Sequence, residues 1–313
     1  MKILHITPHM GGGVGTVIMG WIQKDKAHSH RVISLDVVNE KAWNSGLTFI
    51  HGVQREWFSV FESDIVVLHF WDHTMLYDLL DKPFPECRVV AWAHKNYPVP
   101  QRYLDYPDLF IDTSPIQGHG RHIWSTGGIS RFLEIKPKAH KGFNIGYVGE
   151  ISYKGKMHPD IFDMCNAIDI PDVHFTFVGE NKTAMTSGDK FTFTGKVDDV
   201  APYLAEMDVF GYPLRPDHYG TCEQVIGEAM AAGVVPVLLG NPAEREIGFW
   251  VTDVGQYVLQ IEYLYKHSEL ILRETYGKRA RERAREIYSI DNMVSEWNKV
   301  FDEMMQKPKR SHG

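Results

Sequence analysis

Short apolar segments alternate with helical stretches along most of this chain, and this alternation limits its fold more than any other feature. Ile65–His69 and Val89–His94 are typical, since both are rich in Val, Leu and Ala. Continuous apolar runs of this length predict strands buried on both faces, and their alternation with helices predicts parallel sheets. The other predicted strands are Lys2–Thr7, Arg31–Val38, Asn144–Val148, His174–Gly179, Phe191–Gly195, Val209–Pro213 and Val234–Leu239.

The length and the polar stretches predict two domains. A chain of 313 residues with 43% hydrophobic residues is long enough for two α/β cores. Residues 136–142 are polar and contain a proline, as interdomain linkers do. We therefore predict domains at 1–138 and 142–286. They are followed by an amphipathic helix at about 290–306 and a frayed tail.

Charge and cysteine content narrow the classes of function. Lys and Arg number 33 against 40 Asp and Glu, and a net charge of −7 argues against a general nucleic-acid binder. Three widely spaced cysteines suit free thiols in a reducing cytoplasm. No run of 18 apolar residues predicts a membrane span, so we expect a cytoplasmic protein. The basic helical stretch Glu262–Glu286 is typical of a solvated face, and attraction to anionic lipid at the inner membrane face is the alternative.

One helix combines an anion-binding end with a carboxylate. Thr221 and Gln224 have capping-box spacing and Gly233 follows a helix-forming run, which predicts a helix at about 222–232. Thr221 and Glu228 would then share a face, about 10 Å apart along the axis. The amide end at Gly220–Glu223 suits a diphosphate and the carboxylate suits vicinal hydroxyls, as in a nucleotide-sugar. A capped helix with a surface glutamate is the alternative.

The N-terminal half offers a glycine loop and two histidines at strand ends. Gly12, Gly13 and Gly15 follow the first predicted strand, an order found in phosphate-binding loops and in simple tight turns. The spacing departs from that of a dinucleotide fingerprint, although Asp36 keeps a dinucleotide-dependent oxidoreductase open as an alternative. His69 and His94 end predicted strands, where ligands of parallel sheets gather.

The run GTCEQVIGEAMAAGVVPVLLGNPAEREIG resembles the donor-site signature of family 4 glycosyltransferases. That signature contains two glutamates separated by seven residues; Glu228 matches the second, and Gly220 stands in place of the first. The resemblance implies the α/β GT-B fold, in which two Rossmann-like parallel-sheet domains face each other across a cleft and a C-terminal helix returns to the N-terminal domain. It also implies transfer of a sugar from a nucleotide diphosphate sugar with retention of configuration.

The resemblance also implies roles for particular residues. The family segment V-G-R-x-x-x-x-K-G is matched here by VGEISYKGK, with Glu150 in place of its arginine. Lys154 is the expected diphosphate cation, Glu228 the ribose ligand and His94 a contact to sugar or acceptor; these three are the predicted catalytic residues. The other predicted substrate contacts are Gly12, Gly13, Gly15, His69, Lys156, Lys196, Val197, Arg215, Gly220, Thr221, Cys222 and Glu223.

No two aspartates are separated by one residue, so the Asp-x-Asp metal site of the other major glycosyltransferase fold is absent. We expect neither a metal nor a cofactor, and charge stabilisation by cations and helix-end amides. The expected partners are a nucleotide-sugar donor and an acceptor of unknown class: sugar, lipid or small molecule. Because Gly220 and Glu150 depart from the family pattern, a GT-B-shaped scaffold without catalysis is an alternative. Glu244 and Glu246 are expected to be surface charges.

Overall fold

The computed structural model describes residues 1–36, 49–51, 60, 62–267 and 271–312. The predicted strand Arg31–Val38 therefore ends partly outside the described residues. The chain forms two compact units: Met1–Gly128 with Tyr219–Cys222 and Tyr288–Gly313, and Ile129–His218 with Glu223–Ile287.

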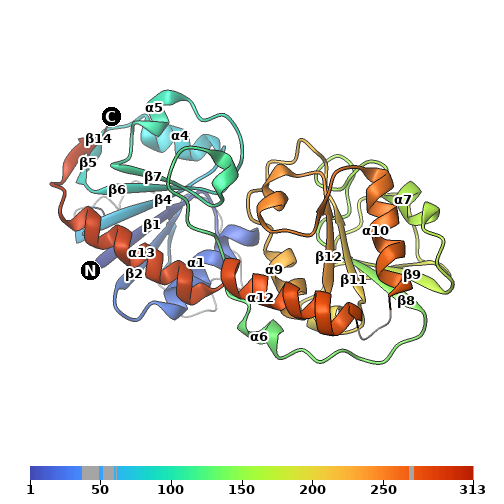
Figure 1. The fold of residues 1–313 in the computed structure, drawn as a ribbon. Helices are drawn as coiled ribbons and strands as arrows, with labels where there is room; N and C mark the ends of the chain where they lie inside the picture. The colour runs from blue at the N-terminus through green and yellow to red at the C-terminus, as the bar shows by residue number, and fades with distance from the viewer. Residues whose placement is uncertain (37–48, 52–59, 61, 268–270, 313) are drawn as a thin grey trace. The chain divides into compact units, whose positions relative to one another are not determined.

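The first unit is built on a six-stranded parallel sheet (Figure 1). Its helical segments are α1 (Gly12–Lys24), α4 (Thr74–Leu80), α5 (Gln101–Leu104), η1 (Pro115–Gln117) and α13 (Ile290–Met305). In spatial order its strands are β3 (Phe49–His51), β2 (Ser29–Ser34), β1 (Lys2–Thr7), β4 (Ile65–Phe70), β6 (Val89–Ala93) and β7 (Leu109–Asp112).

The last long helix packs on the first sheet, as the fold class requires. In α13 the buried residues recur at the spacing of one helical face: Met293, Trp297, Val300, Phe301 and Met304. They share a hydrophobic core with Trp21 of α1 and with Trp92 of β6. Figure 1 shows α13, in red, beside the blue α1.

The predicted frayed tail is wrong. β14 (Arg310–His312) pairs antiparallel with β5 (Phe84–Cys87), and His312 is 3% exposed. The His312 ring lies 2.8 Å from the carbonyl oxygen of Tyr106 and 3.0 Å from that of Cys87. These partners come from distant parts of the chain, so the local polarity of the tail could not indicate them.

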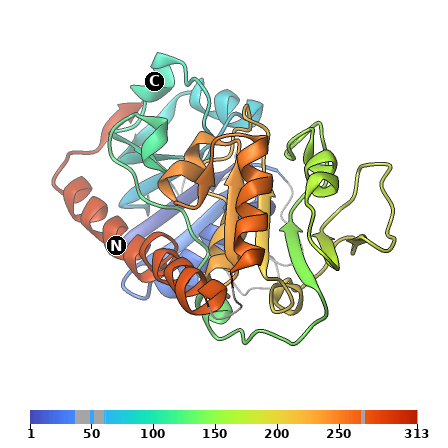
Figure 2. The same cartoon turned by 45° about the vertical axis from the view of Figure 1, so that its right-hand side comes forward.

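The second unit has a six-stranded parallel sheet of its own, with α10 (Val254–Lys266, orange in Figure 2) covering β12. In spatial order its strands are β10 (Phe191–Phe193), β9 (Val173–Val178), β8 (Phe143–Val148), β11 (Val209–Pro213), β12 (Val235–Leu239) and β13 (Trp250–Val251). The helical segments are α6 (Ser130–Leu133), α7 (Ile161–Ala167), α8 (Ala201–Leu204), α9 (Gln224–Ala231), η2 (Pro242–Glu246), α10, the π-helical η3 (Leu272–Gly277) and α12 (Lys278–Ile287).

The two parallel sheets confirm the predicted fold class of two Rossmann-like units. No helix in the described parts of the chain is both long and apolar enough to span a membrane.

Candidate functional site

The second sheet has one point where its strand order reverses. The chain leaves β8 toward β9 on one side, and β11 lies on the other side. Ligands of open parallel sheets bind beyond the carboxyl ends of the strands at such a reversal. Lys156 follows β8, Tyr212 lies near the end of β11, and Glu223 comes just before α9.

These three side chains contact one another. The Lys156 ammonium lies 2.7 Å from Oε2 of Glu223, and the Tyr212 hydroxyl donates to the same oxygen at 3.0 Å. The ammonium also lies 5.6 Å from the centre of the Tyr212 ring. The side chains of Lys156 and Glu223 are 21% and 14% exposed, so the pair is shielded from bulk water but reachable from it.

The electrostatics keep Glu223 ionised. Burial by itself would raise its pKa, but the neighbouring Lys156, His218 and the hydrogen bonds from Lys156 and Tyr212 lower the pKa below its usual value. A lysine ammonium carries three N–H donors, and Glu223 occupies one of them. The site therefore holds a fixed cation beyond the strand ends with donors left for an anionic ligand.

Lys156, not Lys154, lies in this cluster. Lys154 is exposed. Glu150, which stands where the family has arginine, lies 3.0 Å from the ammonium of Lys182. The Arg215 guanidinium makes two 2.8 Å contacts to the Asp217 carboxylate and donates to a backbone carbonyl, while its backbone N–H donates to the carbonyl of Lys156. Arg215 is thus next to the Lys156 segment, with its side chain held by a neighbouring aspartate.

The predicted start of the helix at about 222–232, which carries the donor-site signature, is wrong. α9 begins at Gln224 with Glu223 as N-cap, and no side chain caps it. The hydroxyl of Thr221 instead bonds to that of Thr113 at 2.5 Å and donates to the carbonyl of His94 at 3.3 Å. Because the hydroxyl of Thr221 makes this buried tertiary contact, it does not cap α9 as the local spacing predicts. The predicted end is confirmed, because Gly233 follows the last turn with a φ of +82°.

The predicted donor-helix residues divide between the two units. Gly220, Thr221 and Cys222 belong to the first unit, whereas Glu223 and Glu228 belong to the second. The thiol of Cys222 donates to the carbonyl of Ser125 at 3.1 Å. Glu228 lies within α9 and is partly buried.

Two further predicted contacts, Lys196 and Val197, follow β10. The Lys196 side chain is 80% exposed and lies 3.5 Å from Glu180, and Val197 is partly buried. Their predicted contact with the base of the nucleotide stays a prediction.

In the first unit the predicted glycine loop is the first turn of α1, with Gly11 as its N-cap. Gly12 has a φ of +64°, and a Cβ there would meet no atom within 4 Å. A Cβ on Gly15 would lie 1.8 Å from the carbonyl oxygen of Met10. Gly15 is therefore needed for close packing of the helix start, while Gly12 and Gly13 lie at its open end.

The two strand-end histidines belong to a larger set. His69 is fully buried, and each of its two ring nitrogens lies within hydrogen-bond distance of a neighbouring histidine. Nε2 of His69 lies 3.0 Å from Nδ1 of His5, and Nδ1 of His69 lies 2.9 Å from Nε2 of His94. His69 thus has no ring nitrogen left for a substrate, whereas His94 is partly exposed. A sequence signal for His5 exists, because it is a polar residue inside an apolar strand.

Burial keeps these rings neutral. It lowers the pKa of His94 to about 3. Burial, followed by the nearby imidazoles, also lowers the pKa of His69, and burial with His30 lowers that of His5.

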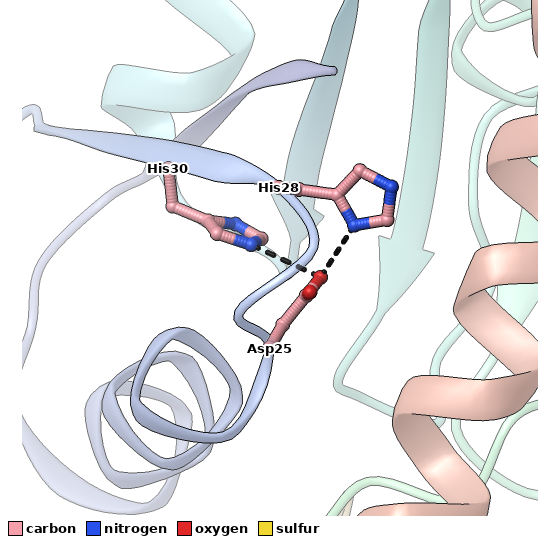
Figure 3. Close-up of side chains that lie close together, drawn as sticks. All are labelled: Asp25, His28 and His30. Carbon is pink, nitrogen blue, oxygen red and sulfur yellow. Dashed lines mark hydrogen bonds and ion pairs between the residues drawn. The ribbon is translucent and has the colours of Figure 1, made fainter.

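Asp25, His28 and His30 form the one group with metal-ligand composition in the described residues (Figure 3). One oxygen, Oδ2 of Asp25, lies 2.8 Å from Nδ1 of His28 and 3.1 Å from Nε2 of His30. A tetrahedral zinc at about 2.0–2.1 Å from each ligand would hold ligand atoms about 3.3 Å apart. The contact to His28 is shorter than that, so we interpret the group as hydrogen bonded.

Glu244 corrects another prediction, because it is 1% exposed rather than a surface charge. Neither of its carboxyl oxygens has a hydrogen-bond partner in the described part of the chain. Burial, and then the charge of Glu223, raise its pKa well above the usual value, against the opposing effect of Lys156.

Comparison with solved structures identifies the fold of the chain. The chain has the GT-B fold, and solved structures of that class cover nearly all of it. A glycosyltransferase from Rickettsia africae is 14% identical with a TM-score of 0.73, covering 98% of this chain and 99% of its own. Anabaena HepE in complex with UDP and glucose is 14% identical with a TM-score of 0.71, covering 96% and 99%. The lipopolysaccharide outer core galactosyltransferase WaaB is 14% identical with a TM-score of 0.65, covering 97% and 100%.

Residues 142–267 match the family model described as "Glycosyl transferases group 1". No curated protein sequence matches the chain. The family match over residues 142–267 and the shared fold confirm the resemblance to family 4 glycosyltransferases that the sequence indicates.

Proposed function

We propose that this protein transfers a sugar from a nucleoside diphosphate sugar to an acceptor hydroxyl, with retention of configuration and without a metal or another cofactor. The observation that carries the proposal is Lys156, a shielded cation at the strand-order reversal of the family-matched unit. A diphosphate is the anionic part of such donors, and a fixed cation stabilises the charge that develops on it as the sugar leaves. A UDP-sugar is the first donor to test, because HepE has been solved with UDP and with UDP-glucose.

The remaining roles follow the same scheme. Glu223 and Tyr212 hold the ammonium of Lys156 in place, and Glu228 accepts hydrogen bonds from the ribose hydroxyls. His94 contacts the transferred sugar or the acceptor. The departing phosphate oxygen can take the acceptor proton, so the scheme needs no separate general base.

A ligand panel tests the donor class. A ligand that binds only the folded protein raises its melting temperature, so UDP-, GDP- and ADP-glucose should be compared with NAD and NADP. We expect a shift with one nucleotide-sugar, and release of its nucleoside diphosphate over hours without acceptor. A shift with NAD or NADP alone would favour an oxidoreductase, and nucleotide-sugar binding without any release would favour a scaffold. Retention is read from the anomeric configuration of the product, and metal independence from activity in a chelator.

Substitution of the lysine tests the site. Lys156→Gln removes the cation and should lower kcat/KM about 100-fold, the size found when one charge-stabilising donor is removed. Lys141→Gln, at an exposed lysine of the same unit, is the matched control. Lys154→Gln separates the two candidate lysines, since a larger loss there would return the diphosphate role to Lys154.

A further inference from the structure

A line of imidazoles crosses the first sheet. His30 lies on β2, His5 on β1, His69 on β4, and His94 directly follows β6, so four adjacent strands contribute one histidine each. The ring nitrogens of neighbouring histidines are 2.9, 3.0 and 2.9 Å apart along the line. At the far end, Nε2 of His30 lies 3.1 Å from Oδ2 of Asp25 (Figure 3).

The strand register explains why the rings meet. His30 is opposite Ile3, two residues before His5. His5 is opposite Val67, two residues before His69. His69 in turn is opposite Trp92, two residues before His94. A stagger of two residues keeps every side chain on the same face of the sheet and moves the line toward the carboxyl ends of the strands.

Hydrogen bonding then fixes the proton positions. A neutral imidazole has one N–H donor and one acceptor nitrogen, so each contact along the line must contain one proton. The Asp25 carboxylate can only accept, which requires the proton of His30 to be on Nε2. Nδ1 of His30 therefore accepts from Nε2 of His5, and the same choice repeats at His69 and His94.

We propose that Asp25, through His30, His5 and His69, sets the tautomer of His94, so that His94 carries its proton on Nε2 and presents Nδ1 as a hydrogen-bond acceptor to a substrate hydroxyl. Asp25 and the three intervening histidines are positioning residues. Nδ1 of His94 has no hydrogen-bond partner within the described parts of the chain, and the residue is partly exposed. The role toward a substrate rests on the proposed function, whereas the tautomer does not.

The substitution Asp25→Asn tests the proposal, because it should reverse the tautomer of every histidine along the line. Oδ1 of Asp25 accepts from the backbone N–H of Ala27 at 2.9 Å, so the oxygen of an asparagine stays there and its NH₂ group replaces Oδ2. That group donates to Nε2 of His30, which moves the proton of His30 to Nδ1. Each later ring must reverse as well, and His94 ends with its proton on Nδ1.

The readout is the ¹⁵N spectrum of histidine-labelled full-length protein near neutral pH, in which protonated and unprotonated ring nitrogens are well separated. The His94 signals are assigned from their loss in His94→Gln. We expect Nε2–H in the unsubstituted protein and Nδ1–H in Asp25→Asn. Asp112→Asn is the matched control, because Asp112 is a buried aspartate 2.9 Å from Nδ1 of His119, outside the line; it should leave His94 unchanged.

The unsubstituted protein alone can overturn the proposal, even if Asp25→Asn does not fold. Nδ1–H or a mixture of tautomers at His94 would do so, as would one equivalent of zinc in the purified protein that is lost in Asp25→Asn. If a nucleotide-sugar is turned over, Asp25→Asn should lower kcat at least tenfold with little change in the KM of the donor. If no nucleotide-sugar is turned over, the proposed function fails while the tautomer measurement still decides this inference.

Discussion

At the scale of single residues, Glu244 is an ionisable side chain whose burial inside the second unit favours its neutral, protonated form. It is buried without a hydrogen-bond partner in the described residues, near the ionised Glu223. Its pKa is raised by burial, so the folded protein keeps this proton at a pH where the unfolded chain has lost it. Its contribution to stability is therefore complete below the unfolded pKa and is lost as the pH rises toward the folded pKa.

Glu244→Gln removes this titration. We expect its free energy of unfolding, relative to that of the unsubstituted protein, to rise by about 1.4 kcal/mol per pH unit above a pH of about 4.5, up to the folded pKa. Urea unfolding at several pH values measures it. Glu246→Gln, at an exposed position of the same segment η2, should show a difference that does not vary with pH. A flat difference for Glu244→Gln would mean that Glu244 is ionised in the folded protein.

At the scale of elements, α9 shows which helix signals are local and which are not. Its end depends on Gly233, whose positive φ needs no partner elsewhere and is visible in the sequence as a glycine after a helical run. Its start does not follow the capping-box spacing, because the hydroxyl of Thr221 is bonded to Thr113, 108 positions earlier in the chain.

Gly233→Ala should destabilise the second unit by about 1–3 kcal/mol, the cost of a side chain held in the left-handed region. A Cβ there would also lie 2.7 Å from Nε of Arg281, which must move. Gly188→Ala is the matched control, since its φ is not in that region and a Cβ meets nothing within 4 Å. Thermal unfolding measures both, and equal melting temperatures for the two variants would contradict the strain at Gly233.

At the scale of the whole molecule, the first unit is completed by the end of the chain. Trp297 and Phe301 of α13 are fully buried in the core that contains Trp21 and Trp92. Removing one such aromatic side chain costs about 3–5 kcal/mol, and a domain is stable by only about 5–15 kcal/mol.

A chain ending at Ile287 should therefore lose the first unit while keeping the second. Hydrogen exchange read by mass spectrometry should show loss of protection in β1 and β4, with β8 and β11 still protected. A chain ending at Gln306 keeps α13 and should retain protection in β1. Full protection of β1 and β4 in the shorter chain would show that α13 is dispensable for that core.

Much of the fold could be predicted from the sequence, because its signals are local. The strands at Lys2–Thr7 and Val209–Pro213 have the predicted bounds, since an unbroken apolar run between turn residues needs no distant partner to be recognised. β5 and β14 were missed for the opposite reason, because an edge strand and a polar tail become strands only by pairing with each other.

Periodicity is enough to predict the two-sheet class, and the contiguous signature around Glu228 is enough to predict which residue types a donor site would use. Tertiary structure alone decided that Lys156 meets Glu223, 67 positions away, and that Glu244 is buried. It also decided that the four histidines form a line, because strand register, which local sequence does not encode, brings side chains from adjacent strands within hydrogen-bond distance.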